Sequence, residues 1–221
     1  MRVRKKRNGE KRLAACADLL VSSPAEAFPG SSNTSEKRPL CLEIGCGKGK
    51  FITEMAQRET ECDFIAMELV TDVIMLAMER AKGLEGGCPE NLRFMNVSAE
   101  RLDEIFEPRS VSRIYLNFSD PWPKARHAKR RLTYRTFLDR YKRILTEDGE
   151  LIIKTDNDGL FDFTLEQLSE YGWKMTEVTR DLHSEPYSKD NIMTEYETAF
   201  SERGKTINHL RASYPCDGQV N

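Results

Sequence analysis

The chain has 221 residues, of which 39% are hydrophobic and 32% are charged, and its formal net charge at pH 7 is -2. This length allows one domain with a substantial core. Because the net charge is slightly negative, any affinity for nucleic acid must come from a local cluster of cations. No apolar run is long enough to span a membrane. Cys16 and Asp18 interrupt the apolar segment after the basic start, which argues against a signal peptide.

The six cysteines are scattered without a CxxC pair, and the three histidines are equally dispersed. We therefore predict reduced thiols, a cytoplasmic protein and no metal site. Residues 1–38 are expected to form a basic arm and linker. An amphipathic helix would follow Arg12 as far as Val21, and a mobile segment would run from Ser22 to Arg38. The cations of Arg2–Arg12 suit either a nucleic-acid-binding arm or a solubilising tail.

A glycine-rich turn follows the first predicted strand, Leu40–Ile44. From Glu43 the sequence reads EIGCGKG and then shows a helical pattern over Lys50–Arg58, the strand, turn and helix of a dinucleotide or nucleoside site. Glycine lets the backbone approach a ligand closely, and the helix start supplies free N–H groups. A dehydrogenase fingerprint would place another glycine where Lys50 stands. Glu43 would repel a phosphate and could attract a cationic ligand, so a pyrophosphate site is disfavoured.

The second predicted strand, Phe64–Met67, ends in Glu68. A carboxylate at this position can accept hydrogen bonds from both hydroxyls of a ribose. Thr71 is expected to cap a helix that runs to Lys82.

The third predicted strand, Leu92–Val97, is followed by a short helix that ends at Phe106. Either Asn96 or Ser98 could reach the edge of an adenine from the end of this strand.

The fourth predicted strand, Val111–Phe118, leads into the segment NFSDPWPKARHAKRR. Two prolines flank Trp122 just after Asp120. Each proline fixes its own φ and pushes the preceding residue out of the helical region, so the loop should be extended and semi-rigid. The cations that follow are Lys124, Arg126, His127, Lys129, Arg130 and Arg131. A carboxylate and a flat ring beside such a run suit the binding of a polyanion with bases: the cations would bind its backbone, and the carboxylate and the ring would hold one base. The alternative is a solvated basic loop in which Trp122 covers an edge of the core.

The remaining elements alternate between helix and strand. They are a helix at Tyr134–Leu145, a turn at Glu147–Gly149, a strand at Leu151–Thr155 that ends in Asp156, a helix at Leu160–Tyr171, a strand at Trp173–Thr179, a polar loop at Arg180–Asn191 and a strand at Thr194–Ser201. No helix precedes this last strand, so it is expected to be antiparallel to its neighbour. The order predicts an α/β fold, with a mostly parallel sheet and helices on both faces.

Five motifs, in this order, resemble a single family. They read LEIGCGKGKF, FIAMEL, YLNFSDPWPKARHAKRRL, KTDN and NIMTEYE, and over roughly residues 40–210 they resemble the bacterial tRNA (guanine-N7)-methyltransferases. The DPWPKxRHxKRR segment is highly specific, whereas the glycine turn alone is a weak signal. The resemblance implies a Rossmann-like class I methyltransferase fold, S-adenosylmethionine as cofactor and a guanine in the variable loop of tRNA as substrate. Residues 39–212 would form the methyltransferase domain and 213–221 a tail, in a monomer or a homodimer.

The resemblance also implies roles for individual residues. Asp120 corresponds to the catalytic aspartate, which also lies beside the cofactor. The other cofactor contacts implied are Glu43, Gly45, Gly47, Glu68 and either Asn96 or Ser98; the substrate contacts are Lys124, Asp156, Thr194, Glu195, Tyr196 and Glu197; the RNA-binding segment is Arg126, His127, Ala128, Lys129, Arg130 and Arg131. Many members carry Asp where this chain has Ser98, which leaves the adenine contact open between Asn96 and Ser98.

The chemistry of guanine explains why carboxylates gather in this pattern. N7 carries a lone pair and no proton in neutral guanine, so its attack on a sulfonium methyl needs no general base. Two tasks remain for the enzyme: it must align the guanine with the methyl group, and it must stabilise the positive charge that develops on the purine. Asp120, Asp156 and Glu197 are candidates for both tasks, and Trp122 could pack on the base.

Two other functions share parts of the pattern. A nicotinamide-dependent oxidoreductase would use the same fold, but Lys50 disfavours it. An RNA-binding module without catalysis is disfavoured by the intact set Glu43, Gly45, Gly47, Glu68 and Asp120.

Overall fold

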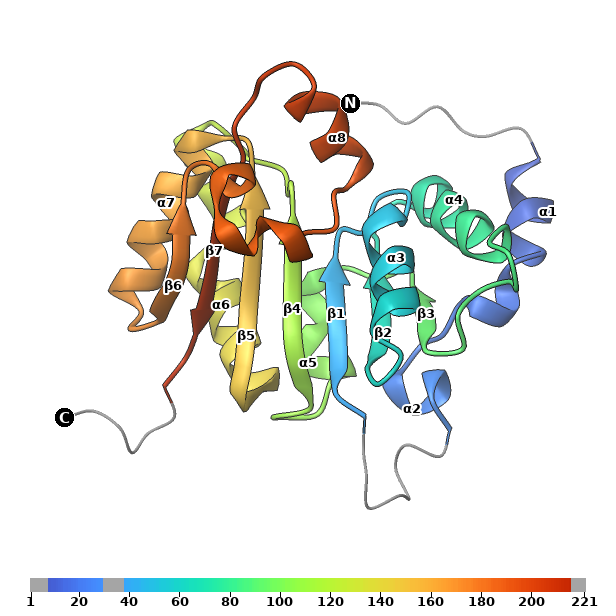
Figure 1. Ribbon diagram of the computed structural model, residues 1–221. Helices are drawn as coiled ribbons and strands as arrows, with labels where there is room; N and C mark the ends of the chain where they lie inside the picture. The colour runs from blue at the N-terminus through green and yellow to red at the C-terminus, as the bar shows by residue number, and fades with distance from the viewer. Residues whose placement is uncertain (1–7, 30–37, 216–221) are drawn as a thin grey trace. The chain divides into compact units, whose positions relative to one another are not determined.

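The computed structural model describes residues 8–29 and 38–215. The chain divides into two compact units, Met1–Phe106 and Glu107–Asn221, and Figure 1 labels their helices and strands. Among the described residues, no helix combines the length and apolar character that a membrane span requires. The cytoplasmic location and the division into arm, domain and tail stay predictions.

In its described residues, the first unit contains three parallel strands in the order β3-β2-β1. Their bounds are β1 Leu40–Ile44, β2 Asp63–Met67 and β3 Leu92–Met95, and the helices between and after them are α3 Lys50–Arg58, α4 Thr71–Lys82, η2 Ala99–Arg101 and α5 Leu102–Ile105. Every residue of β2 is buried, as expected for a parallel strand covered on both faces. In Figure 1 the arrowhead of β1 points to the top of the view, where the glycine turn leads into α3.

The described part of the N-terminal arm is bound to this unit. It forms α1 Gly9–Ala14, η1 Ala17–Leu19 and α2 Pro24–Ala27. Arg12 Nε donates to Glu79 at 2.6 Å, and Lys82 Nζ donates to the Ala15 carbonyl at 2.7 Å. Residues 12–15 of the arm therefore pack on α4.

The predicted helix through Val21 is wrong, because α1 ends at Ala14. The Val21 N–H donates to the Phe94 carbonyl of β3 at 2.9 Å, so pairing with the sheet edge replaces helical hydrogen bonding here. The predicted linker contains α2, which Ser23 caps through the Glu26 N–H at 3.2 Å. The other predictions for residues 1–7 and 30–37 lie outside the described residues.

As far as residue 215, where its description ends, the second unit contains four strands in the order β4-β5-β7-β6. They are β4 Val111–Asn117, β5 Leu145–Thr155, β6 Lys174–Thr179 and β7 Asn208–Ser213; the helices are η3 Ala125–Arg130, α6 Arg135–Ile144, α7 Asp158–Glu170, η4 Leu182–Ser184, η5 Pro186–Asp190 and α8 Glu195–Ser201. β4 and β5 are parallel, and β7 is antiparallel to both of its neighbours. Figure 1 shows β6 and β7 as arrows that point in opposite directions.

The predicted strand at Thr194–Ser201 is wrong, because this segment is the helix α8. Thr194 and Glu197 form a capping box, in which the Thr194 hydroxyl accepts from the Glu197 N–H at 2.9 Å. Tyr196 and Phe200 lie one helical turn apart, and their rings stack with centroids 4.1 Å apart. The antiparallel last strand exists, but it is β7.

The predicted turn at Glu147–Gly149 lies inside β5, which begins at Leu145. Leu145 pairs with Val111 and Glu150 pairs with Arg113, so the residues between them bulge out of register. The other predicted helices and strands agree with the structure within a few residues at their ends.

Candidate active site

The glycine turn of the first unit is held by backbone hydrogen bonds. The N–H groups of Gly45 and Cys46 donate to the Met67 carbonyl at 2.8 and 3.0 Å, which ties the turn to the end of β2. Gly45 has φ 81° and Gly47 has φ 56°, a left-handed region that residues with a Cβ rarely adopt. A Cβ added at either glycine would meet nothing within 4 Å, so open space lies beside both.

Gly49 has a different role, which the sequence reasoning missed. It is the N-cap of α3 with φ 79°, and a Cβ built on it would stand 2.8 Å from the Cβ of Ala77 in α4. The absence of a side chain at Gly49 therefore lets α3 begin against α4. The sequence did contain a signal for this packing: Gly49 is the third glycine of the motif, and in such turns a glycine often allows a helix to pack closely on its neighbour.

Glu68 lies directly after β2 and is fixed by two backbone donors. Gly47 N–H donates to its Oε2 at 3.3 Å, and Val70 N–H donates to its Oε1 at 2.9 Å. A carboxylate has about four acceptor positions, so these two bonds leave capacity for two further donors. The side chain is half-buried and preorganised, which fits the predicted contact with a ribose diol.

Glu43 is the fourth residue of β1 and is only 2% exposed. Its charge and that of Glu68 both act on Cys46 in the glycine turn. Burial raises the pKa of the Cys46 thiol well above its ordinary value, and the two carboxylates raise it further. The surroundings of the turn are therefore negative, which suits a cationic ligand and not a pyrophosphate.

Asn96 organises the loop after Glu68. Its Nδ2 donates to the carbonyls of Glu68 and Leu69 at 2.8 and 3.0 Å, and its Oδ1 accepts from the Thr71 hydroxyl at 2.7 Å. The prediction that Thr71 caps α4 is wrong, because the N-cap is Val70 and the Thr71 hydroxyl bonds Asn96.

Ser98 caps η2, with its hydroxyl accepting from the Glu100 N–H at 3.2 Å. Leu69, which the sequence reasoning did not single out, leaves 66% of its surface exposed beside Glu68. The structure places Asn96 in direct contact with the Glu68 loop and Ser98 at the start of the next helix.

The glycine turn and Glu68 fit the cofactor that the family resemblance implies. The sulfonium and the amino group of S-adenosylmethionine are cationic, and its ribose offers two hydroxyl donors. The open space beside Gly45 and Gly47, the negative surroundings and the spare acceptors of Glu68 meet these requirements.

In the second unit, the loop after β4 adopts unusual backbone conformations. Phe118 has φ 53° and Trp122 has φ 41°, both in the left-handed region. Such conformations cost of order 1–3 kcal/mol each and persist only where surrounding contacts impose them. One such contact is the Phe118 N–H, which donates to the Lys154 carbonyl of β5 at 2.8 Å. Asp120, between these two residues, is exposed.

The cationic run forms η3 and presents most of its charges to solvent. Lys124, Arg126, Lys129 and Arg130 are exposed, whereas His127, Ala128 and Arg131 are half-buried. Arg130 lies over the ring of Trp122 at 4.9 Å, and His127 meets the same ring edge-on at 5.8 Å. Trp122 is half-buried. Through these two contacts its ring links the Asp120 loop to the cationic run.

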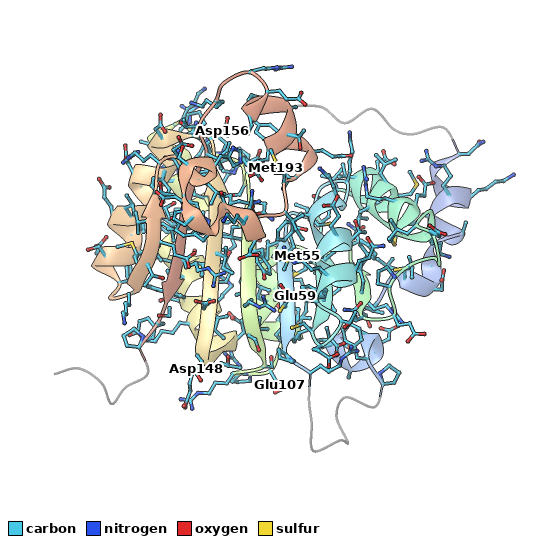
Figure 2. All side chains as sticks on the ribbon, in the orientation of Figure 1. Met55, Glu59, Glu107, Asp148, Asp156 and Met193 are labelled. Atoms are coloured by element: carbon cyan, nitrogen blue, oxygen red, sulfur yellow. The ribbon has the colours of Figure 1, made fainter. Side chains whose placement is uncertain are left out.

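Asp156, Tyr196 and Phe118 come together from three elements. Tyr196 donates its hydroxyl proton to Asp156 Oδ2 at 3.4 Å, and its ring centroid lies 5.0 Å from that of Phe118. Burial and the Asp156 carboxylate raise the pKa of Tyr196, so the phenol stays protonated. Tyr196 is 43% exposed. Figure 2 shows Asp156 at the end of β5 opposite to Asp148, where Met193 precedes α8.

Glu197 is fully buried, and residues of its own unit surround its carboxylate. Oε2 accepts from Lys154 Nζ at 2.7 Å, and Oε1 accepts from Asn191 Nδ2 at 2.7 Å and lies 2.9 Å from His183 Nε2. Burial alone would raise the pKa of Glu197, but Lys154, His183 and Asn191 outweigh it and hold the pKa below its usual value. Glu197 thus fastens α8 to β5.

Of the predicted substrate residues, Asp156 and Tyr196 are therefore brought together, Thr194 closes the capping box, Glu195 is the first residue of α8, and Lys124 is exposed in the loop. The direct contacts predicted for all of these residues and for Glu197 stay predictions.

Comparison with known proteins decides the family. A family model described as "Putative methyltransferase" matches residues 37–210. A "tRNA (guanine-N(7)-)-methyltransferase" of Bacillus velezensis is 46% identical over 210 residues, 94% of each chain. The protein of the same name from Bacillus subtilis is 44% identical over 209 residues, 94% of this chain and 96% of its own. The chain belongs to the tRNA (guanine-N7)-methyltransferase family. The predicted family and enzyme class are confirmed, with S-adenosylmethionine as the methyl donor of this family.

Solved structures confirm the fold of this tRNA (guanine-N7)-methyltransferase family member. The 16S rRNA methyltransferase KamB superposes with a TM-score of 0.63 at 16% identity, over 88% of this chain and 95% of its own. A structure titled an antibiotic-related methyltransferase gives 0.61 at 15% identity, over 87% and 94%. The predicted class I methyltransferase fold, with a mostly parallel sheet and an antiparallel last strand, is therefore correct. The nicotinamide-dependent alternative is set aside.

Proposed function

We propose that this chain transfers the methyl group of S-adenosylmethionine to N7 of a guanine in the variable loop of tRNA. The observation that carries the proposal is the 46% identity, over 94% of the chain, to a protein named tRNA (guanine-N(7)-)-methyltransferase. The two carboxylate-bearing loops described above support it, because each supplies groups that suit one part of the reaction.

The first unit would hold the cofactor, which supplies an electrophilic methyl group on sulfur. Glu68 would accept from the ribose hydroxyls, and Glu43 would attract the cationic amino group beside Gly45 and Gly47. Asn96 keeps the Glu68 loop in place, so its expected effect on adenine is indirect, whereas Ser98 would meet the adenine edge. The exposed side chain of Leu69 offers apolar surface to the purine ring.

The second unit would hold the guanine. N7 attacks with its own lone pair, so no residue has to remove a proton before methyl transfer. Asp120 would orient the base and stabilise the positive charge that forms on the purine. Asp156 and Tyr196 would border the base, the first as an acceptor and the second as an aromatic wall beside Phe118.

The exposed cations of η3, together with Lys124 directly before it, would bind the tRNA backbone. Lys124, Arg126, Lys129 and Arg130 supply charge in a chain whose net charge is -2, so the attraction to phosphate is local. Binding through such contacts should weaken steeply as salt rises.

The test is methyl transfer to an unmodified tRNA transcript, with methyl-labelled S-adenosylmethionine and mapping of the modified base. The expected product carries 7-methylguanine in the variable loop. A transcript in which that guanine is replaced by adenine serves as the control and should take up no label. Label at another base or position would refute the substrate assignment, and binding of tRNA without transfer would favour a non-catalytic RNA-binding module.

A further inference from the structure

One arginine of the cationic run differs from the others in what it contacts. Arg131 Nε donates to the Pro121 carbonyl at 3.1 Å, and its Nη2 donates to the Trp122 carbonyl at 3.1 Å. These acceptors are the two residues directly after Asp120. The planar fork of a guanidinium can donate to two neighbouring carbonyl groups at once, which a lysine ammonium cannot match in geometry.

The same guanidinium also lies over the ring of Phe163, 4.3 Å from its centroid. Phe163 belongs to α7, and its ring is parallel to that of Tyr134 with centroids 6.5 Å apart. The chain just after Arg131 is fastened to α7 as well, through the buried hydrogen bond from the Thr164 hydroxyl to the Thr133 hydroxyl at 2.9 Å. Arg131 therefore connects the Asp120 loop to an anchored helix.

The backbone of this loop needs such a connection. Trp122 has φ 41° and precedes Pro123, a combination that a bulky side chain adopts only under constraint. Without donors for the carbonyls of Pro121 and Trp122, the loop would relax toward a more common conformation. Asp120, one residue before Pro121, would move with it.

We propose that Arg131 is a positioning residue for Asp120 and not a phosphate contact, and this rests on the role proposed above for Asp120. Lys124, Arg126, Lys129 and Arg130 are exposed and suit phosphate binding, whereas Arg131 is half-buried and directed at the loop. The cationic run thus has two functions, tRNA binding along its exposed part and support of the catalytic loop at its end.

The test compares Arg131→Lys and Arg131→Ala with Arg126→Ala. Under the proposal, Arg131→Lys keeps the charge but lowers the single-turnover rate, at saturating tRNA and cofactor, by about tenfold or more, because small misplacement of a catalytic group is costly. Arg131→Ala lowers it further, and the slope of log affinity for tRNA against log salt stays at the wild-type value. Arg126→Ala, in contrast, should reduce this slope by about 0.7–0.9.

Arg140→Lys is the matched control. Arg140 in α6 donates to the Thr136 carbonyl at 2.7 Å and lies over the Phe137 ring at 5.7 Å, so it makes the same kinds of contact away from the loop. This variant should keep the wild-type rate. A wild-type rate in Arg131→Lys, or a reduced salt slope in Arg131→Ala with the rate intact, would overturn the proposal.

A second measurement separates this inference from the proposed function. The chain has two tryptophans, and Trp173→Phe leaves Trp122 as the only tryptophan, whose fluorescence can be excited selectively at wavelengths that tyrosine does not absorb. In that background, Arg131→Lys should make the Trp122 fluorescence more accessible to a neutral quencher, whether or not methyl transfer to tRNA occurs. Unchanged quenching would refute the support of the loop by Arg131. An inactive wild-type protein whose quenching responds to Arg131→Lys would refute the proposed function alone.

Discussion

The glycine turn of the first unit and the Asp120 loop of the second both follow a parallel β-strand, but they are held in different ways. In the glycine turn, the positive φ angles belong to Gly45, Gly47 and Gly49, and backbone N–H groups donate to carbonyls nearby. In the Asp120 loop, the positive φ angles belong to Phe118 and Trp122, which carry large side chains.

The difference shows two physical routes to a preorganised site. Glycine adopts a left-handed conformation at little cost in conformational energy, because it has no Cβ. The first loop therefore depends mainly on having glycine at these positions. Phenylalanine and tryptophan make the same region costly, so the second loop depends on contacts from residues distant in sequence. Lys154 reaches it through its carbonyl group, and Arg131 through its guanidinium. The first loop should therefore respond to steric changes and the second to the loss of partners.

The largest expected effect comes from the buried pair that supports the second unit. Glu197→Gln keeps the shape of the side chain but leaves the charge of Lys154 buried without its counter-ion, which should lower the free energy of unfolding at pH 7 by about 3–5 kcal/mol. Urea denaturation measures it. Glu202→Gln, at the exposed C-terminal end of α8, is the control and should change stability by less than about 0.5 kcal/mol.

The same variant gives a pH dependence whose sign follows from the pKa of Glu197. This pKa is lower in the folded chain than in the unfolded chain. The stabilisation is therefore complete above the ordinary glutamate pKa, about 4.3, and is lost as the pH falls through the lowered value. The gap in stability between wild type and Glu197→Gln should narrow with acid over that window. A gap that stays constant would show that the charge of Glu197 contributes little.

The next effect is on catalysis by the Asp120 loop. Asp120→Ala removes the carboxylate and should slow single-turnover methyl transfer by roughly 100–1000-fold, or about 3–4 kcal/mol, because a preorganised charge is lost. Asp120→Asn separates charge from orientation: it should be nearly as slow if charge dominates, and should recover much of the rate if orientation does. If a folded Asp120→Ala variant keeps a rate within a few-fold of wild type, Asp120 does not have the catalytic role, and Asp156 becomes the next candidate.

A steric change in the glycine turn tests the other half of the comparison. Gly49→Ala adds a methyl 2.8 Å from the Cβ of Ala77 at φ 79°, so strain and overpacking together should cost about 2–4 kcal/mol of unfolding free energy. Gly86→Ala is the matched control, since Gly86 has φ 88° and nothing within 4 Å of an added Cβ. It should cost only the backbone strain, about 1–2 kcal/mol. Equal losses in a thermal or urea melt would show that the packing of α3 on α4 tolerates the methyl group.

The smallest effect concerns cofactor binding beside the glycine turn. Glu68→Ala should weaken binding of S-adenosylmethionine by about 1.5–3 kcal/mol, the value of hydrogen bonds to a charged group, and leave tRNA affinity near wild type. Calorimetric titration with the cofactor measures the change. Since Glu68 also accepts from the Gly47 and Val70 N–H groups, Glu68→Gln tests whether charge or loop support matters. An unchanged cofactor affinity in folded Glu68→Ala would remove the ribose assignment.

Much of this protein could be predicted from local patterns. The strand, glycine turn and helix at 40–58 follow from residues that are neighbours in the chain, and so do the acidic end of β2 and the parallel α/β order. The motif around Asp120 predicted the family, because the spacing of its prolines, aromatic ring and cations is a local property of the sequence. What these predictions share is that they use patterns of a few neighbouring residues and the order of those patterns along the chain.

Tertiary structure decided what depends on distant partners. Thr71 bonds Asn96 in place of capping its helix, and Glu197 folds into α8 against Lys154, 43 positions away, in a segment that the sequence analysis had predicted as a strand. Arg131 looks like its cationic neighbours in the sequence, yet its guanidinium is directed at two carbonyl groups and a ring of α7. A charged side chain has the same sequence signal whether it faces phosphate, a buried counter-ion or the backbone. Only packing brings one of these partners within hydrogen-bonding distance.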